Sequence, residues 1–299
     1  MKSQTLGPIR IHRIVEIDRL PVQPDRFFCG ISPETVDRAK QILDERFIDP
    51  ESNEIIVSFH SFVVEADGRR ILVDACHGND KQRTGNIAYA NSLHTGYLTN
   101  LASAGFKPED IDIVLCTHLH YDHVGWNTRL ENGRWVSTFP NAKYLMTKVD
   151  FDHFSRLPEG TPESHHAGAF EDSVLPVVRE GRAELLEADH IPGFDLSPDV
   201  CLEPAPGHTP GSVIVRIRND FGAAVLSGDV IHHPIQILEP RLYVEGEHDT
   251  AQATRTRERL IEDCADTGAI LLPAHFPDPT TGRIVRSSGG YRFECGAVR

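Results

Sequence analysis

The chain has few cysteines, no signal peptide pattern and no long hydrophobic run. Its six cysteines are scattered along 299 residues without the paired spacing of a disulfide framework. The first eight residues, Met1 to Pro8, lack the apolar core of a signal peptide, and no apolar run approaches membrane-spanning length. We therefore expect a soluble cytoplasmic protein whose cysteines are free thiols.

Positive charge is also scarce. The chain has 30 Lys and Arg residues against 44 Asp and Glu residues, a formal net charge of −14. A field of this sign repels polyphosphate, which excludes general binding of nucleic acid and suits neutral or cationic small molecules. Hydrophobic residues make up 39% of the chain, enough for the core of one large α/β domain or two small ones.

Hydrophobic periodicity predicts two similar halves in which strands are followed by a helix. Asp67-Gly68 marks the turn of a hairpin with strands at 55–65 and 69–75. Other strands are expected at 10–17, 111–116, 142–146, 200–204, 211–218, 222–227 and 269–272, helices at 32–47, 94–105, 149–157 and 249–267, and a loop at 158–190. The extension up to about residue 54 is expected to cover the site or to form a dimer surface.

Metal-binding residue types gather directly after the predicted strand at 111–116. Residues 116–126 read Cys-Thr-His-Leu-His-Tyr-Asp-His-Val-Gly-Trp, with three histidines and an aspartate within six positions. Buried polar groups at a strand end need partners, and a metal ion supplies them. The candidate metal ligands are His118, His120, Asp122, His123, His208, Asp229 and His275.

This donor set has consequences for the metal. Imidazole and carboxylate ligands without a thiolate suit Zn²⁺, Mn²⁺, Co²⁺ or Fe²⁺. Seven ligands are too many for one zinc ion, so two divalent ions are expected, most simply two Zn²⁺. Two such ions share a hydroxide and lower its pKa toward neutrality.

The ordered ligand set resembles the metallo-β-lactamase superfamily. The resemblance covers roughly residues 55–276 and is carried by 118–123, by Gly207-His208-Thr209, by Gly228-Asp229 and by His275. It implies an α/β fold, a four-layer αββα sandwich, with residues 1–299 forming a single domain. It also implies that His118, His120 and His208 hold one ion, that Asp122, His123 and His275 hold the other, and that Asp229 bridges the two.

Three observations bear on the branch of that superfamily. His120 stands where the oxygen-reducing di-iron branch has a carboxylate, which favours a hydrolase. The surroundings of Trp126 and His275 resemble those of homoserine lactonases and organophosphate hydrolases. Those lactonases typically carry a tyrosine three residues after the bridging aspartate, whereas this chain has His232, as members similar to methyl parathion hydrolase do.

These residues together predict a zinc-dependent hydrolase with a lactonase or esterase activity. A metal-bridging hydroxide is expected to open a lactone or carboxylic ester, with Asp122 or His232 protonating the leaving alkoxide. The substrate is expected to be a small molecule, neutral and partly apolar. The alternatives are a phosphotriester hydrolase using the same site, a thioester or β-lactam hydrolase, and an inactive metal-binding sensor. A homodimer formed through the N-terminal helix is a further hypothesis.

Two sets of residues are expected to support the site. Asp74, at the end of a predicted strand, is expected to accept a hydrogen bond from a ligating imidazole and to fix its tautomer. The candidates for an apolar pocket wall, with core packing as the alternative, are Phe28, Phe59, Trp126, Phe194 and Ile235. For Phe59 core packing is the favoured interpretation.

Overall fold

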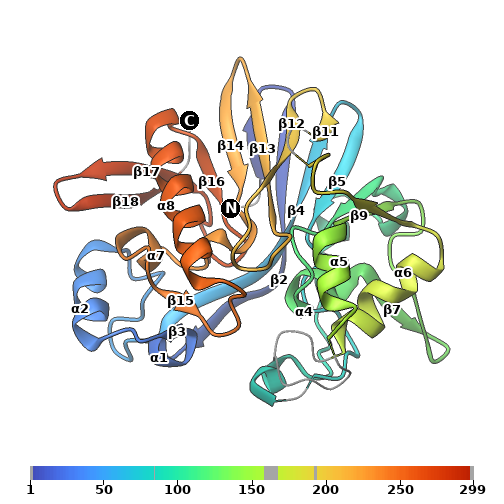
Figure 1. Ribbon diagram of the computed structural model, residues 1–299, viewed down its shortest axis with the longest axis horizontal. Coiled ribbons are helices and arrows are strands. Elements are labelled where there is room, and N and C mark those ends of the chain that lie inside the picture. Colours follow the sequence, from blue (N-terminus) through green and yellow to red (C-terminus); the bar gives the residue numbers. More distant parts are fainter. Residues whose placement is uncertain (1–2, 84, 158–167, 192–193, 297–299) are drawn as a thin grey trace.

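Two seven-stranded sheets form the centre of the computed structural model, and helices flank them on both outer sides (Figure 1). The structure describes all residues except 1–2, 84, 158–167, 192–193 and 297–299. The arrangement is the expected four-layer αββα sandwich. None of the described helices has the length and apolarity needed to cross a membrane.

The first sheet begins with antiparallel hairpins and continues with parallel strands. In spatial order it contains β1 (Ser3–Leu6), β2 (Ile9–Val22), β4 (Ile55–Ala66), β5 (Arg69–Val73), β6 (Ile113–Leu115), β9 (Lys143–Thr147) and β10 (Ala183–Leu186). The pairs from β5 to β10 are parallel. Because parallel strands end at the same edge of a sheet, the segments after β5 and β6 lie together.

The second sheet is mostly antiparallel. It contains, in spatial order, β11 (Phe194–Ser197), β12 (Val200–Pro204), β13 (Val213–Asn219), β14 (Gly222–Leu226), β16 (Ile270–Leu272), β17 (Gly282–Ser287) and β18 (Gly290–Cys295). Its single parallel pair among the described strands is β14 with β16. The segments that follow these two strands therefore also meet at one edge.

The helices and the small hairpins cover the sheets. The longer helices are α2 (Pro33–Ile42), α3 (Tyr97–Ser103), α5 (Lys148–Phe154) and α8 (Thr250–Thr267), and the shorter ones are α1 (Pro24–Phe27), α4 (Tyr121–Val124), α6 (Leu175–Arg179) and α7 (Ile235–Leu238). Two small sheets pair β3 (Phe28–Cys29) with β15 (Tyr243–Val244) and β7 (Thr128–Glu131) with β8 (Arg134–Ser137). In α8, the Asp249 side chain caps the first turn and Gly268 ends the helix in the left-handed conformation.

Three hydrophobic clusters fill the three spaces between the four layers. In β5, Leu72 packs with the helices beside the first sheet, whereas Ile71 packs between the two sheets. In β14, Leu226 packs between the sheets, whereas Val225 belongs to the cluster that includes α2 and α8. The two-residue period of a strand thus places apolar side chains on both faces of each sheet.

Most expected elements are present, but two expectations are wrong and one hairpin was missed. The helix expected at 32–47 ends at Ile42, since Leu43 already has an extended backbone. In the expected loop 158–190, the described part forms a short π-helix at Phe170–Val174, then α6 and β10. These elements form because Phe170, Val174 and Val177 pack into the core. The hairpin of β17 and β18 was not expected at all.

A buried lysine ties the loop after β5 to the β7–β8 hairpin. The Lys81 side chain is fully buried, and its Nζ donates to Thr128 Oγ1 (2.5 Å) and lies 3.7 Å from the centre of the Trp135 ring. Asp172 Oδ1 is its nearest carboxylate oxygen, at 3.5 Å. Burial outweighs that charge and lowers the pKa of Lys81 to about 7.

Replacing this lysine should change how stability depends on pH. Between pH 7 and 10.5 the unfolded chain binds more protons at position 81 than the folded chain, so the free energy of unfolding rises with pH in this window. We expect Lys81→Met to flatten that rise in denaturant unfolding measured across the window. The exposed Lys143→Met variant should keep the wild-type slope, and an unchanged slope in Lys81→Met would contradict the prediction.

Candidate metal centre

The seven predicted ligands meet at the edge where the parallel strands of both sheets end. His118 to His123 follow β6, Asp229 follows β14 and His275 follows β16. His208 lies in the loop between β12 and β13, next to the position where the Val213 N–H donates to Thr117 O and joins the sheets. The fold thus gathers residues that are up to 157 positions apart in the chain.

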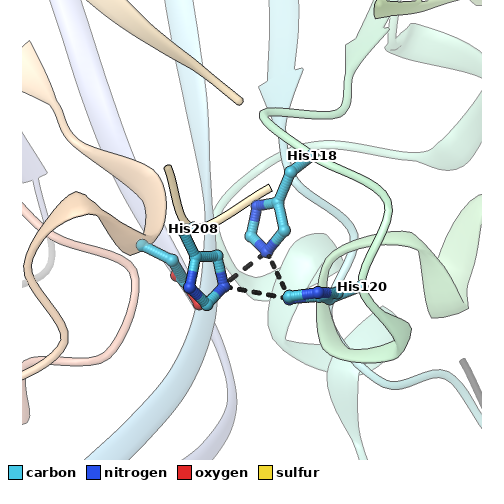
Figure 2. Close-up of side chains that lie close together, drawn as sticks. His118, His120 and His208 are labelled. Carbon is cyan, nitrogen blue, oxygen red and sulfur yellow. Dashed lines mark hydrogen bonds and ion pairs between the residues drawn. The ribbon is translucent and has the colours of Figure 1, made fainter. Parts of the chain in front are cut away.

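The first group consists of His118, His120, His208 and Asp229, whose ligand atoms all lie within 4.8 Å of one another. Figure 2 shows the three imidazoles converging on one point. His120 Nδ1 lies 3.0 Å from His118 Nε2 and 2.9 Å from His208 Nε2. Asp229 Oδ2 completes the group, 3.3 Å from His208 Nε2.

The second group consists of Asp122, His123 and His275, again within 4.8 Å of one another. Asp229 Oδ1 lies 3.2 Å from His123 Nε2 and 3.0 Å from His275 Nε2. Its other oxygen, Oδ2, contacts His208 of the first group and also lies 3.2 Å from His275 Nε2. The carboxylate therefore lies between the two groups, which is the position of a bridging ligand. The structure brings all seven predicted ligands together in these two groups.

Hydrogen bonds on the outer side of three rings leave the inner nitrogens as lone-pair donors. The Nδ1 atoms of His118, His123 and His275 lie 3.1, 2.9 and 3.2 Å from Thr117 Oγ1, Asp74 Oδ2 and Ser58 O, respectively. With Nδ1 protonated, each Nε2 presents a lone pair to the centre. Nitrogens that converge within 3 Å cannot all carry protons, so this donor set fits a cation.

The charges of the site agree with that assignment. Burial opposes ionisation of Asp229, but the imidazoles of His123 and His275 outweigh it and hold its pKa well below the usual value. Burial also lowers the pKa of His123, yet the carboxylates of Asp229 and Asp74 raise it well above its usual value. A field that favours a proton between these side chains favours a divalent cation in the same place.

The predicted hydrogen bond between Asp74 and an imidazole of the candidate ligand set is present, and its partner is His123. Besides the bond from His123 Nδ1, the Asp74 carboxylate accepts the N–H of Thr117 (2.8 Å) and the Thr117 hydroxyl (2.9 Å). One side chain thus orients His123 directly and His118 through Thr117. Gly228, with φ of +47°, packs so close that a Cβ there would lie 2.9 Å from Thr117 Oγ1.

Glu16 is a support that sequence reasoning missed. Its buried carboxylate accepts the Trp126 indole N–H (2.6 Å), the backbone N–H of His77 (2.8 Å) and the Thr95 hydroxyl (3.1 Å). It also lies 3.0 Å from the ring Nδ1 of His77. This network holds the turn that follows the metal motif. A register shift interrupts the pairing of β2 with β4 between Val15 and Ile17, so Glu16 has no partner residue in β4.

A cavity of about 340 Å³ opens above the two groups. Its wall is mostly apolar and is formed by Leu20, Pro21, Val22, Arg26, Phe27, Val57, Phe59, Ile87, Tyr89, Tyr121, Val244 and Glu245. Its floor is formed by His120, Asp122, His208, Asp229, His232 and His275. The segment 20–27 of the N-terminal extension thus contributes directly to the wall.

The candidate wall residues had mixed outcomes. Phe59 packs in a core cluster, as favoured, and also lines the cavity. Phe28, Trp126, Phe194 and Ile235 pack in or against the core clusters and do not line it. His232 lies on the floor, with Nε2 3.2 Å from Asp229 Oδ2. Most of the wall carries no motif, so nothing in the sequence pointed to it.

Comparison with known proteins assigns the family. A profile described as the Metallo-beta-lactamase superfamily matches residues 60–275. The chain belongs to the metallo-β-lactamase superfamily. This match includes six of the seven candidate ligands before its last residue, which is His275 itself.

Relatives within this superfamily are named as lactonases. The N-acyl homoserine lactonase AttM of Azorhizobium caulinodans is 26% identical over 191 residues, which cover 61% of this chain and 65% of that protein. An N-acyl homoserine lactonase of Bacillus cereus is 26% identical over 129 residues, 43% of this chain and 42% of that protein. The matched part of the chain spans less than two thirds of the length of these relatives.

Two solved structures share the fold over nearly the whole chain. The hydrolase AbOPH of the beta lactamase superfamily superposes with a TM-score of 0.79 at 22% identity, covering 99% of this chain and 97% of that one. The dizinc quorum-quenching lactonase AidC, in complex with a product, has a TM-score of 0.78 at 21% identity, covering 100% and 98%. These likenesses show the fold.

Removing the Asp74 carboxylate should weaken metal binding. Asp74→Asn keeps the shape but turns one acceptor oxygen into a donor. In place of Oδ1 this donor faces the Thr117 N–H, and in place of Oδ2 it faces the His123 ring N–H and the Thr117 hydroxyl. We expect the affinity of the second group to fall about 10- to 100-fold, measured by competition with a chromophoric chelator. Asp67→Asn, in the exposed turn before β5, is the control, and equal affinities in the two variants would contradict this role for Asp74.

Proposed function

We propose that this chain is a zinc-dependent hydrolase that opens a lactone or cleaves a carboxylic ester. The observation that carries the proposal is the pair of ligand groups sharing Asp229 at the floor of an apolar cavity. A pair of bound divalent ions supplies a hydroxide at neutral pH and polarises the carbonyl oxygen of the substrate. A nucleophilic serine or cysteine is not required for this chemistry.

The residues have separate roles in the proposal. His118, His120 and His208 would hold one ion, Asp122, His123 and His275 would hold the other, and Asp229 would contribute to both. Asp74 keeps His123 in the tautomer that ligates. The ionised state of Asp122 is supported by its surroundings, since the charges of His123 and His275 outweigh burial and lower its pKa.

The cavity wall supports a neutral, partly apolar substrate. Leu20, Val22, Phe27, Phe59 and Val244 offer hydrocarbon surface close to the ligand groups, which favours an acyl or alkyl arm. In this proposal the N-terminal extension is part of the substrate pocket rather than a separate module. The names of the related lactonases support the lactone as the first substrate class to test.

His232 is proposed as the residue that protonates the leaving alkoxide. Asp122, the alternative donor, is ionised and would first have to take up a proton. His232 lies on the cavity floor, and its Nδ1 is buried without a hydrogen-bond partner among the described residues. A ring N–H at this position can donate to an oxygen that gains charge as the ester bond breaks. The role does not depend on carbon as the attacked atom, so a phosphotriester hydrolase using the same site is the second candidate.

Metal removal tests the first part of the proposal. We expect dialysis against a chelator to abolish hydrolysis of a γ-lactone or nitrophenyl acetate, and Zn²⁺, Mn²⁺ or Co²⁺ to restore it. Full turnover by rigorously metal-free protein would exclude the mechanism. A higher kcat/KM for a dialkyl aryl phosphate than for any lactone or ester would favour the second candidate. Protein that holds two ions yet hydrolyses no ester, lactone or thioester would support a sensor.

Substitution of His232 tests the proton donor. We expect His232→Asn to lower kcat about 10²-fold or more for substrates with a poor alkoxide leaving group, and less for a nitrophenolate that leaves without protonation. His232→Tyr should recover part of the loss because a phenol can also donate. His233→Asn is the matched control, since His233 Nε2 pairs with Phe47 O away from the cavity. Equal losses for both leaving groups would contradict the role.

A further inference from the structure

Asp150 is a buried carboxylate that the proposed reaction leaves unused. It lies in the first turn of α5, directly after β9, and its side chain is fully buried. The Thr147 hydroxyl already caps this helix by accepting the Asp150 N–H (3.3 Å). The carboxylate of Asp150 is therefore available for contacts outside its own helix.

Those contacts join two loops that carry metal ligands. Asp150 Oδ2 accepts the Thr209 hydroxyl at 2.8 Å, and Asp150 Oδ1 accepts the Gly211 N–H at 2.6 Å. The backbone N–H of Leu119 donates to the same carboxylate. Leu119 lies between His118 and His120, and Thr209 directly follows His208, so one side chain holds both loops that supply the three histidines of the first group.

The close approach of Asp150 to the loop after His208 depends on the glycine at position 211. A Cβ at position 211 would lie 2.7 Å from Asp150 Oδ1, so only glycine lets the loop after His208 reach the carboxylate. Thr147 strengthens the same junction, because its hydroxyl donates to Gly211 O at 3.0 Å. The loop is thus held by Asp150 through an N–H and by Thr147 through a carbonyl.

The charge of Asp150 has no ordinary partner. Among the described residues, no Lys, Arg or His side chain lies within ion-pair distance of it, and burial raises its pKa to about 7 despite three hydrogen-bond donors. A buried carboxylate without a cation is costly. A divalent cation held by the neighbouring histidines would supply the missing positive charge.

We propose that Asp150 is a positioning residue for the first group, holding His118, His120 and His208 at ligating spacing and adding negative charge behind the cation. This inference rests on the metal-binding part of the proposed function and not on the substrate. Hydrogen-bonded partners of ligands orient them and raise affinity, and their removal typically costs 10- to 100-fold in metal affinity. The loss here should fall on the first group only.

The test measures metal binding rather than turnover. Asp150→Asn keeps the volume, removes the charge and leaves one of three donors without an acceptor. We expect its affinity for one of two Co²⁺ ions to fall about 10- to 100-fold, with the other ion retained. Titration followed by the electronic absorption of Co²⁺ should show the band of the histidine-rich site weakened, while the band of the second group persists.

Two further variants keep the test decisive. Asp152→Asn, exposed on the same helix and paired with Lys148, should bind both ions as the wild type does. Thr209→Val removes one donor and leaves the carboxylate, so it should lower the affinity for the same ion by a smaller factor. This variant decides the test if Asp150→Asn does not fold without metal.

The outcomes separate this inference from the proposed function. Wild-type affinity for both ions in a folded Asp150→Asn protein, or equal loss of both ions, would overturn the positioning role. Wild-type protein that binds two ions but hydrolyses no lactone or ester would overturn the proposed function, yet the comparison of metal affinities would still test Asp150.

Discussion

The architecture of the site follows from the burial of six imidazole and carboxylate side chains around one carboxylate, Asp229. Its oxygens contact histidines of both groups, and nitrogen atoms such as His120 Nδ1 and His208 Nε2 approach within 3 Å. Such a cluster cannot satisfy its lone pairs and charges with protons alone, because buried polar groups need partners. The surrounding hydrogen bonds of Asp74 and Thr117 hold the imidazoles in orientations that leave the centre of the cluster to cations.

The sandwich provides the rigidity that this constraint demands. Parallel pairs in both sheets end at the same edge, and hydrophobic clusters on both faces of each sheet fix the strands from which the loops depart. Polar anchors then fix the loops themselves: Glu16 holds the turn after the motif, and Asp150 holds the loops around His118 and His208.

Much of the fold was accessible from periodicity. The hairpin at Asp67-Gly68 and the long helix α8 were predicted within one or two residues because turn chemistry and helical spacing are local properties. Segments 170–179 and 183–186 were missed because their apolar residues become informative only when they pack against the first sheet. Helix α2 is shorter than predicted because the chain turns at Leu43 to bring Phe47 into the core. The expected dimer stays a prediction.

The sequence by itself determined the identity and order of the proposed ligands, since each stands in or beside a loop at a strand end and residue type alone selects for divalent cations. It also indicated Asp74, whose place after β5 is part of the same pattern. Only the tertiary structure decided that Glu16 and Asp150 are buried carboxylates serving the site, and that residues 20–27 line the cavity. The physical reason is that the partners of these residues come from segments far away in the chain: Glu16 contacts Trp126, and Asp150 contacts Thr209.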